Sequence, residues 1–370
     1  MHATNRTDQV ALGKRAPVHF FSHGSTMMLG EECESASYWK KCGDEALANG
    51  VKGIIMMVRS IPCKPYWGAP RTRLLILFLQ GAHWDALNDK IQVATNPKPN
   101  KSPVAYVHPS KYVNYKLVPD PETGRRCVQL LKAEGFNAEE NPTFDWIHDT
   151  YLIIIRMFPG GSPPTTIVSM NARFDPHYHM KVGATLRHLR DEGYLIIGSG
   201  GAVHNLYRNK WEPMILYRDN FALETPPDNW ALEFRQAVQD VVTKNSGPRL
   251  RRGMTRLMKH PQYRQAHGTD DHFMSAMFVA GAAGGIEDEG VSGRLMAEDW
   301  ELVSRKALDP ACFFWDNDAN GTSLTYRRIC AILSIALGNG LRLLDVGFRR
   351  ESRHISDIGF TSISFSSFPE

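Results

Sequence analysis

Long hydrophobic runs, paired cysteines and a strong charge of one sign are all missing from this chain of 370 residues. No apolar run approaches the ~18 residues that a membrane-spanning helix needs, and the first sixteen residues contain no hydrophobic signal segment. The six cysteines are scattered without a CxxC pair, which predicts free thiols in a reducing compartment. The net charge of +4 is too small for a nucleic-acid-binding surface. We therefore expect a cytoplasmic protein that binds neither nucleic acid nor membrane.

The apolar content of 42% predicts a sizeable core, and the pattern along the chain predicts how that core is layered. Short apolar strands alternate with amphipathic helices, which is typical of an α/β fold. We predict one layered domain with a central mixed sheet and helices on both faces. The expected strands are Val18–Phe21, Gly53–Met57, Thr165–Met170 and Tyr194–Ile197. The expected helices are Cys33–Asn49, Arg125–Glu134, His179–Arg190, Trp230–Thr243 and a last one capped by Asp270 or Asp271.

Two segments allow more than one interpretation. Thr150–Phe158 is apolar and ends at a proline, so it is either a helix or a buried strand. The basic stretch Lys244–Lys259 is either a solvated helix face, which we favour, or a groove for an anionic ligand.

Histidine is the one enriched residue type, with fourteen copies, and several copies follow expected strands. His23 follows the first strand, His83 follows the apolar segment Leu74–Leu79, and His204 follows Tyr194–Ile197. His272 opens the last expected helix. Ligands of open α/β sheets bind at the carboxyl ends of strands. His148 and His179 lie in polar segments that can reach the same rim.

Neutral imidazole is the commonest side-chain metal ligand, so this clustering predicts a metal site. Taken singly, each of these histidines reads as a hydrogen-bonded loop residue. Other sites fit less well: the glycines of GSGGAVHNL do not form GxGxxG, and neither Ser25 nor Ser199 lies in a GxSxG elbow. We interpret the glycines beside His23 and His204 as allowing tight turns and close substrate approach.

The motifs FSHGST, GAHWDA, LRDEGYLIIGSGGAVHNL and AHGTDDHF resemble those of class III extradiol ring-cleavage dioxygenases of the subunit-B type. They are most similar to the branch of the DOPA 4,5-dioxygenases. The resemblance extends in order along the chain from about Ala16 to about Leu302. It implies a catalytic domain over residues 17–303, preceded by a polar tail over residues 1–16.

The resemblance implies roles for individual residues. His23, His83 and His272 match metal-site histidines, and His204 matches a position that is either a fourth ligand or an acid/base group. His148 and His179 match further active-site histidines, which we take as catalytic. Three positions depart from the family pattern and bear on substrate choice: Gly268 after His267, Asp271 in place of a glutamate, and Thr26 in place of a proline.

The implied activity is ring opening of a catechol, a DOPA-like aromatic diol, by O₂. Fe(II) is the implied cofactor, and Zn(II) is possible in the same site. An alternative of another class is a catalytically impaired or non-enzymatic metal-binding member of the same fold. Neither the catechol nor the oligomeric state can be predicted from the sequence.

Two segments interrupt the resemblance. Residues 58–80 separate Gly53–Met57 from the GAHWDA element, and we interpret them as an insertion or an unspliced, translated intron. In a folded chain we expect Leu74–Leu79 to displace Gly53–Met57 from the central strand position beside Val18–Phe21. Residues 304–370 match no motif, and we expect that the core sheet does not use them.

Overall fold

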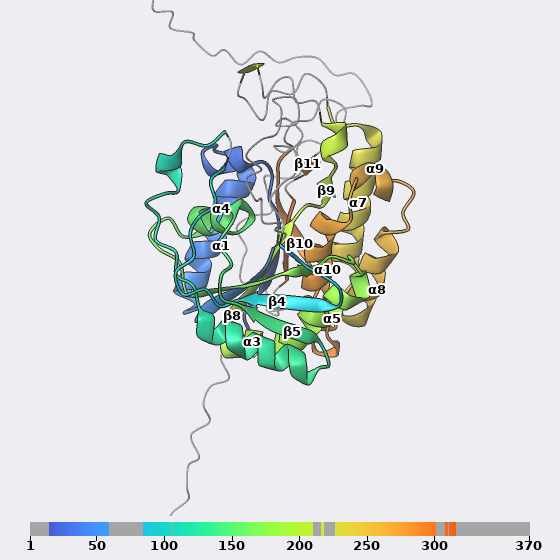
Figure 1. The fold of residues 1–370 in the computed structure, drawn as a ribbon. Coiled ribbons are helices and arrows are strands. Elements are labelled where there is room, and N and C mark those ends of the chain that lie inside the picture. Colours follow the sequence, from blue (N-terminus) through green and yellow to red (C-terminus); the bar gives the residue numbers. More distant parts are fainter. Residues whose placement is uncertain are drawn as a thin grey trace, which may run out of the picture. The chain divides into compact units, whose positions relative to one another are not determined.

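The computed structural model describes most of the chain between residues 15 and 315 (Figure 1). The described ranges are 15–58, 84–104, 106–209, 216–217, 226–300, 308–309 and 311–315. The helices are α1 (Glu34–Ala48), α3 (Pro121–Ala133), α4 (His148–Met157), α5 (Pro176–Leu186), α7 (Asn229–Lys244), α8 (Gly247–Leu257), α9 (Tyr263–Ala266) and α10 (Asp271–Ala283). Short 3₁₀ helices are η1 (Thr26–Leu29), η2 (Pro109–Lys111), η3 (Arg187–Glu192), η4 (Leu206–Arg208) and η5 (Ile286–Asp288).

The strands form one large sheet and two short pairs. They are β1 (Val18–Ser22), β2 (Gly53–Met57), β3 (Asp85–Ala86), β4 (Lys90–Ala94), β5 (Asn137–Asn141), β6 (Thr165–Val168), β7 (Met170–Asn171), β8 (Tyr194–Gly200), β9 (Val203–His204), β10 (Arg294–Glu298), β11 (Leu308–Asp309) and β12 (Ala311–Trp315). The eight-stranded sheet has the order β10-β12-β1-β8-β2-β6-β4-β5. Its central strands β1, β8, β2 and β6 run parallel, whereas β12 pairs antiparallel with β1 and β10, and β4 pairs antiparallel with β6. The predicted mixed sheet of an α/β fold is confirmed.

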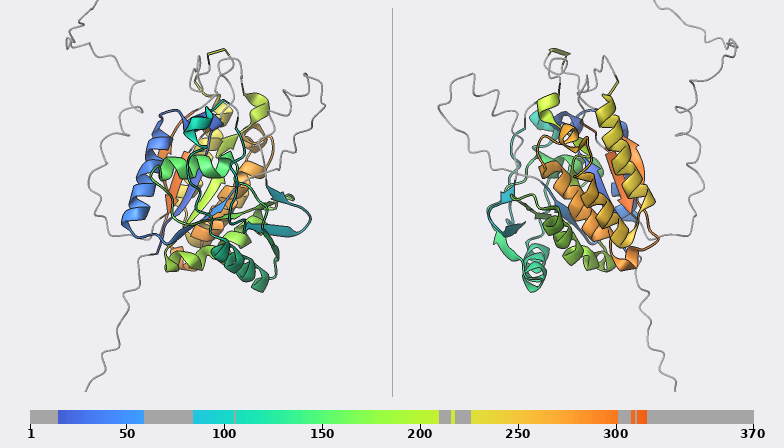
Figure 2. Two further views of the ribbon diagram at one scale, coloured as in Figure 1. Left: turned by 60° about the vertical axis from the view of Figure 1, so that its left-hand side comes forward. Right: turned by 90° about the vertical axis from the view of Figure 1, so that its right-hand side faces the viewer.

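Both faces of the sheet are covered, because the central strands are apolar on both sides. In β2, Ile55 and Met57 belong to one core cluster, while Ile54 and Met56 belong to the other. Helices α5, α7, α8 and α10 pack on the first face, and α1 and α4 pack on the second (Figures 1 and 2). A strand buried on both faces reads as a continuous hydrophobic run, which is the pattern of GIIMM. Within the described residues, no helix is long and apolar enough to cross a membrane.

The predicted displacement of Gly53–Met57 by Leu74–Leu79 is wrong. Gly53–Met57 forms β2, all five of its residues are buried, and it pairs with β8 and β6. The neighbours of β1 are β8 and β12, and β2 lies on the far side of β8. Each side chain of β2 already fills one of the two cores, and this burial fixes the strand in its place. Residues 74–79 lie outside the described residues.

The chain leaves and re-enters the sheet at neighbouring points around the insertion. Met57 of β2 pairs with Val168 of β6, and Asp85 of β3 pairs in parallel with Met170 of β7. The Val58 N–H donates to the Val168 carbonyl, and the Met170 N–H donates to the Trp84 carbonyl. The residues on the two sides of the insertion therefore pair with neighbouring residues of β6 and β7. This is expected if residues 58–80 are inserted into a single strand–loop unit.

The expectation that the core sheet uses no residue after 303 is also wrong. Strand β12 (Ala311–Trp315) lies between β10 and β1 and pairs with both. Without β12, the N–H and C=O groups on this side of β1 would lack their ladder partners. The short strand β11 pairs with β9, beside His204. The rest of residues 304–370 lies outside the described residues.

The basic stretch Lys244–Lys259 folds mainly as α8. Leu250, Met254 and Leu257 are buried in the core, while the arginines at 249, 252 and 256 are exposed. The predicted solvated helix face is confirmed. A cavity of about 270 Å³ between α5 and α8 is lined in part by Lys181, Arg251 and Arg252, and the anion-binding groove stays a prediction.

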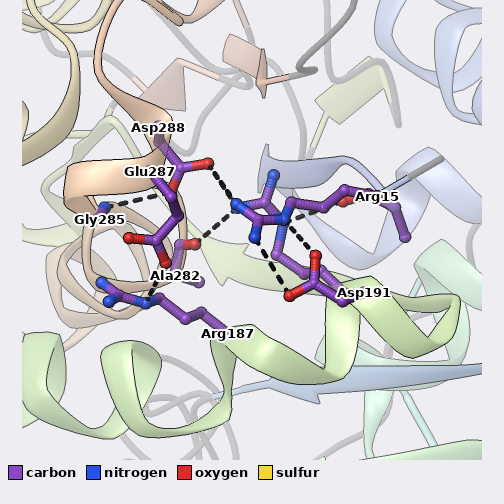
Figure 3. Close-up of polar contacts among 9 residues, drawn as sticks. Arg15, Arg187, Asp191, Ala282, Gly285, Glu287 and Asp288 are labelled. Carbon is purple, nitrogen blue, oxygen red and sulfur yellow. Dashed lines mark hydrogen bonds and ion pairs between the residues drawn. The ribbon is translucent and has the colours of Figure 1, made fainter. Parts of the chain in front are cut away.

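A buried ion pair lies at the amino ends of β1 and β8. The Arg190 guanidinium donates to Asp288 Oδ1 at 3.1 Å and to the Ala16 and Ala282 carbonyls at 2.9 Å. Asp288 also accepts from the Gly285 N–H, and Arg15 extends the network to Asp191 (Figure 3). Burial lowers the pKa of Arg190, and the Asp288 carboxylate opposes this shift. Removal of the Asp288 charge would leave the buried Arg190 guanidinium without its counter-charge.

Candidate metal and catalytic site

Four histidines gather at the carboxyl ends of β1 and β8. His23 follows β1, His204 ends β9, His272 lies in the first turn of α10, and His148 opens α4. The ring centroids of His23 and His272 are 5.4 Å apart, those of His204 and His272 are 3.3 Å apart, and those of His23 and His148 are 6.3 Å apart. His23, His204 and His272 are buried. His83 lies outside the described residues.

Glycines of β8 allow the helix that bears His272 to approach this end of the sheet. A Cβ atom at Gly200 would lie 2.1 Å from the His272 carbonyl oxygen and 2.0 Å from Ser275 Oγ. A Cβ atom at Gly198 would lie 2.6 Å from the Ser275 carbonyl oxygen. These glycines therefore allow a close approach of α10, and the expected close approach of substrate stays a prediction.

The tautomer of His23 follows from its contact with Ser199. Ser199 Oγ donates its single hydrogen to the main-chain carbonyl of Asp149 at 2.9 Å. It must then accept from His23 Nδ1–H, which lies 2.8 Å away. In the neutral ring, Nε2 is therefore the acceptor nitrogen, and it lies 3.5 Å from Asp149 Oδ1. A histidine that ligates a metal typically donates its other ring N–H to a fixed acceptor in this way.

Asp149 lies beside His23 and His148, and the sequence analysis did not single it out. Its carboxylate is buried, and Oδ1 lies 2.5 Å from His148 Nε2. It comes directly after His148 in the first turn of α4, where the helix dipole favours a negative charge. An acidic residue at the start of an apolar helix, next to a candidate histidine, was the signal that could have identified it.

His179 is buried away from the four histidines and makes no contact with their rings within the described residues. Its Nδ1 donates to the Asp175 carbonyl at 2.7 Å, and its Nε2 accepts from the Asn171 N–H at 3.1 Å. Burial lowers its pKa to about 4, so the ring is neutral near pH 7. These bonds join β7 to the start of α5 and give His179 a structural role, while its catalytic role stays a prediction.

His267 and Asp271 lie behind the cluster. The ring of His267 packs against Phe234, Tyr263 and Phe273, and its Nε2–H donates to the Ala202 carbonyl at 2.9 Å. Burial lowers the pKa of His267 to about 4. Asp271 Oδ1 accepts from the Thr269 hydroxyl and lies 3.6 Å from His272 Nδ1.

The donor set fits a non-haem metal in kind. The side chains that converge are imidazoles and a carboxylate, which are the ligands of Zn(II) and of non-haem Fe(II) sites. Across the described ranges, no three His, Cys, Asp or Glu side chains are already arranged to hold a metal ion. The histidine at position 83 is outside those ranges, so the described part of the chain holds only part of the predicted ligand set.

Comparison with known proteins gives a consistent result. A sequence profile described as "Catalytic LigB subunit of aromatic ring-opening dioxygenase" matches residues 17–298. The chain is 22% identical to 4,5-DOPA dioxygenase extradiol of Escherichia coli (strain K12) over 280 residues, 76% of this chain and 90% of that protein. It is 28% identical to 4,5-DOPA dioxygenase extradiol of Portulaca grandiflora over 278 residues, 72% of this chain and 85% of that protein. The crystal structure of an uncharacterized protein from E. coli K12 shares the fold, with a TM-score of 0.58, 20% identity and coverage of 81% of this chain and 99% of that one.

Proposed function

The chain belongs to the family of catalytic LigB subunits of aromatic ring-opening dioxygenases, and from this premise we propose that it opens the ring of a catechol beside the two hydroxyl groups, with O₂ as co-substrate. The observation that carries the proposal is the group of His23, His204, His272 and His148 at the carboxyl ends of β1 and β8, with Asp149 beside His23 and His148. Small molecules bind α/β sheet proteins at this rim.

His23, His83 and His272 are the proposed metal-binding residues. His23 presents Nε2 as the acceptor nitrogen because Ser199 accepts from Nδ1. Fe(II) in this site supplies electron transfer between the bound diol and O₂, which Zn(II), having no redox chemistry, does not supply.

The remaining work of the protein is to orient the substrate, exclude water and move protons. A catechol must lose a phenolic proton, and a neutral imidazole accepts a proton near pH 7. His204 is the proposed acceptor or else a fourth ligand, since its ring stacks on that of His272 with an interplanar angle of 12°. His148 is the other proposed catalytic histidine, held by Asp149 and less buried than the others.

The alternative is a catalytically impaired or non-enzymatic metal-binding member of the same family. One observation favours it: the insertion ends at Gln80, and only Gly81 and Ala82 separate it in the sequence from the proposed ligand His83. In that case the protein would bind metal without consuming O₂ when a catechol is added.

Anaerobic loading with Fe(II), followed by a catechol panel and air, tests the proposal. We expect oxygen uptake together with a yellow ring-opened product, and neither in His272→Ala. His188→Ala is the matched control, because His188 is exposed and contacts only a main-chain carbonyl. Metal uptake without oxygen consumption by the unaltered protein, over the whole panel, would support the non-enzymatic alternative instead.

A further inference from the structure

We propose that Asp149 is a carboxylate ligand of the metal site, with His148 and Ser199 as the residues that position it and its neighbour His23. This inference rests on the proposed function, because it concerns the same site. The contacts that carry it are His23 Nε2 to Asp149 Oδ1 at 3.5 Å, and His148 Nε2 to the same oxygen at 2.5 Å. Neither the motifs nor the predicted ligand set includes Asp149.

The spacing between His23 and Asp149 is that of two ligands on one ion. Ligand bonds of roughly 2.0–2.2 Å with tetrahedral or octahedral angles place two donor atoms about 3.0–3.5 Å apart. The observed separation of Nε2 and Oδ1 is 3.5 Å. The two atoms therefore need little movement to share an ion.

The hydrogen-bonding roles of His23 Nε2 and Asp149 Oδ1 also support a shared ion. Because Ser199 accepts from Nδ1, the neutral His23 ring turns the lone pair of Nε2 toward the carboxylate oxygen. Both atoms are acceptors, and both belong to buried side chains. Two buried acceptors that face each other repel, and a cation between them replaces that repulsion with two favourable bonds.

His148 has a different relation to Asp149. A separation of 2.5 Å is too short for two ligands of one ion, and it is that of an ion-pair contact, which is attractive when the His148 ring is protonated. Carboxylates that bind metals are commonly oriented by neighbouring polar side chains. His148 is thus a positioning residue for Asp149, a role that is compatible with substrate contact through its other nitrogen.

Asp149 also orients His23 through its main chain. Its carbonyl accepts the hydrogen of Ser199, and this leaves Ser199 Oγ as the acceptor for His23 Nδ1–H. The first turn of α4 therefore contacts His23 on both of its ring nitrogens, through Ser199 on one side and through the carboxylate on the other. Ser199 is a positioning residue, and its substitution should weaken metal binding without removal of a ligand.

The competing interpretation is that Asp149 pairs only with protonated His148 or His23 and never contacts the metal. Titration of the metal-free full chain with Zn(II) alone, by calorimetry, separates the two. We expect Asp149→Asn to weaken Zn(II) binding by more than about 100-fold, and Ser199→Ala by about 10–100-fold. Asp145→Asn is the matched control, because this residue lies four positions earlier and binds Asn100 and Asn96.

A spectroscopic variant keeps the test decisive if Asp149→Asn does not fold. In Asp149→Cys loaded with Co(II), a thiolate ligand produces an intense near-ultraviolet charge-transfer band, which we expect here and not in Asp145→Cys. Absence of that band, or unchanged Zn(II) affinity in Asp149→Asn, would overturn the role of Asp149. Failure of the unaltered protein to bind Zn(II) or Fe(II) at all would instead overturn the proposed function.

Discussion

The amino and carboxyl ends of the paired strands β1 and β8 differ in the buried polar groups that they contain. At the amino ends, Arg190 and Asp288 are buried as a pair, and the guanidinium also satisfies two main-chain carbonyls. At the carboxyl ends, the buried groups are imidazoles and the Asp149 carboxylate, and acceptor atoms face each other. At the amino end the guanidinium is paired with a carboxylate of the protein itself, whereas we propose that the carboxyl end is completed by a metal ion. On this proposal, the difference separates a part of the fold that provides stability from a part that provides function.

Loss of a metal-binding histidine should give the largest effect on function. We expect His23→Ala to abolish stoichiometric Fe(II) binding and to reduce ring opening to background, because the alanine methyl group carries no donor atom that could replace Nε2 of this proposed ligand. Metal analysis and oxygen uptake on one sample measure both effects. Full metal content in this variant would contradict the contrast between the two ends of the strands, since metal binding at the carboxyl ends would then not depend on His23.

His204→Ala should have a smaller but still large effect. If His204 is the acid/base group, metal content stays near that of the unaltered protein and turnover falls by about 10²–10⁴-fold. If His204 is a ligand, metal content and turnover fall together. Unchanged turnover would contradict both roles.

At the other end of the same strands, Asp288→Asn should affect stability and leave metal affinity unchanged. Removal of one partner leaves the buried Arg190 charge unpaired, at a cost of about 3–5 kcal/mol in the free energy of unfolding. Urea denaturation measures this cost. Glu287→Gln is the matched control, because its partly exposed pair with Arg187 should contribute only about 0–1 kcal/mol. Equal losses of unfolding free energy in the two variants would show that the buried Arg190–Asp288 pair contributes no more to stability than the partly exposed Arg187–Glu287 pair.

Buried histidines should make the stability of the metal-free protein fall in mild acid. Burial lowers the pKa of His179 and His267 to about 4, below the value of about 6.5 in an unfolded chain. The unfolded chain binds protons first, so the free energy of unfolding falls as pH drops from about 6.5 to about 4, by on the order of 1–3 kcal/mol per histidine. Urea denaturation at several pH values measures the slope. His267→Gln should reduce it and His188→Ala should not.

Deletion of Val58–Gln80 should give the smallest change in stability. β2 pairs with β6 and β3 pairs with β7, so the strands that flank the deletion keep their partners. Closure of a long loop costs only about 0.6 kcal/mol per doubling of its length. We expect the shortened protein to fold, and to equal or exceed the intact chain in metal content and turnover. A shortened protein that binds less metal would show that the insertion contributes to the site. Sequencing of the spliced transcript tests the intron hypothesis separately.

Much of the fold follows from local patterns in the sequence. Apolar segments identified β1, β2, β6 and β8. The segment Thr150–Phe158, left open between helix and strand, proved to be helical, since all of it but Phe158 lies within α4. Strand β5, with the sequence NAEEN, has few apolar residues, so hydrophobic periodicity cannot reveal it. The position of β12 depends on pairing with β1, far away in the chain, and no local signal encodes such a pairing.

The site was predictable in its residue types and less so in its contacts. Histidines after strands pointed to the edge of the sheet at which His23, His204 and His272 lie together, because parallel strands place their carboxyl ends together. His179 fits the same pattern, yet its ring bonds to Asn171 and Asp175 and stays outside the cluster. The relay from Asp149 through Ser199 to His23 joins residues 50 and 176 positions apart, which only the folded chain brings together.

X-ray absorption at the iron edge of the anaerobically loaded protein tests most directly whether the carboxyl ends of β1 and β8 hold the metal. We expect a coordination shell of nitrogen and oxygen donors with the back-scattering of at least two imidazoles, and loss of part of that signal in His23→Ala but not in Asp288→Asn. A shell of oxygen donors alone, or one that is the same in His23→Ala, would contradict this assignment.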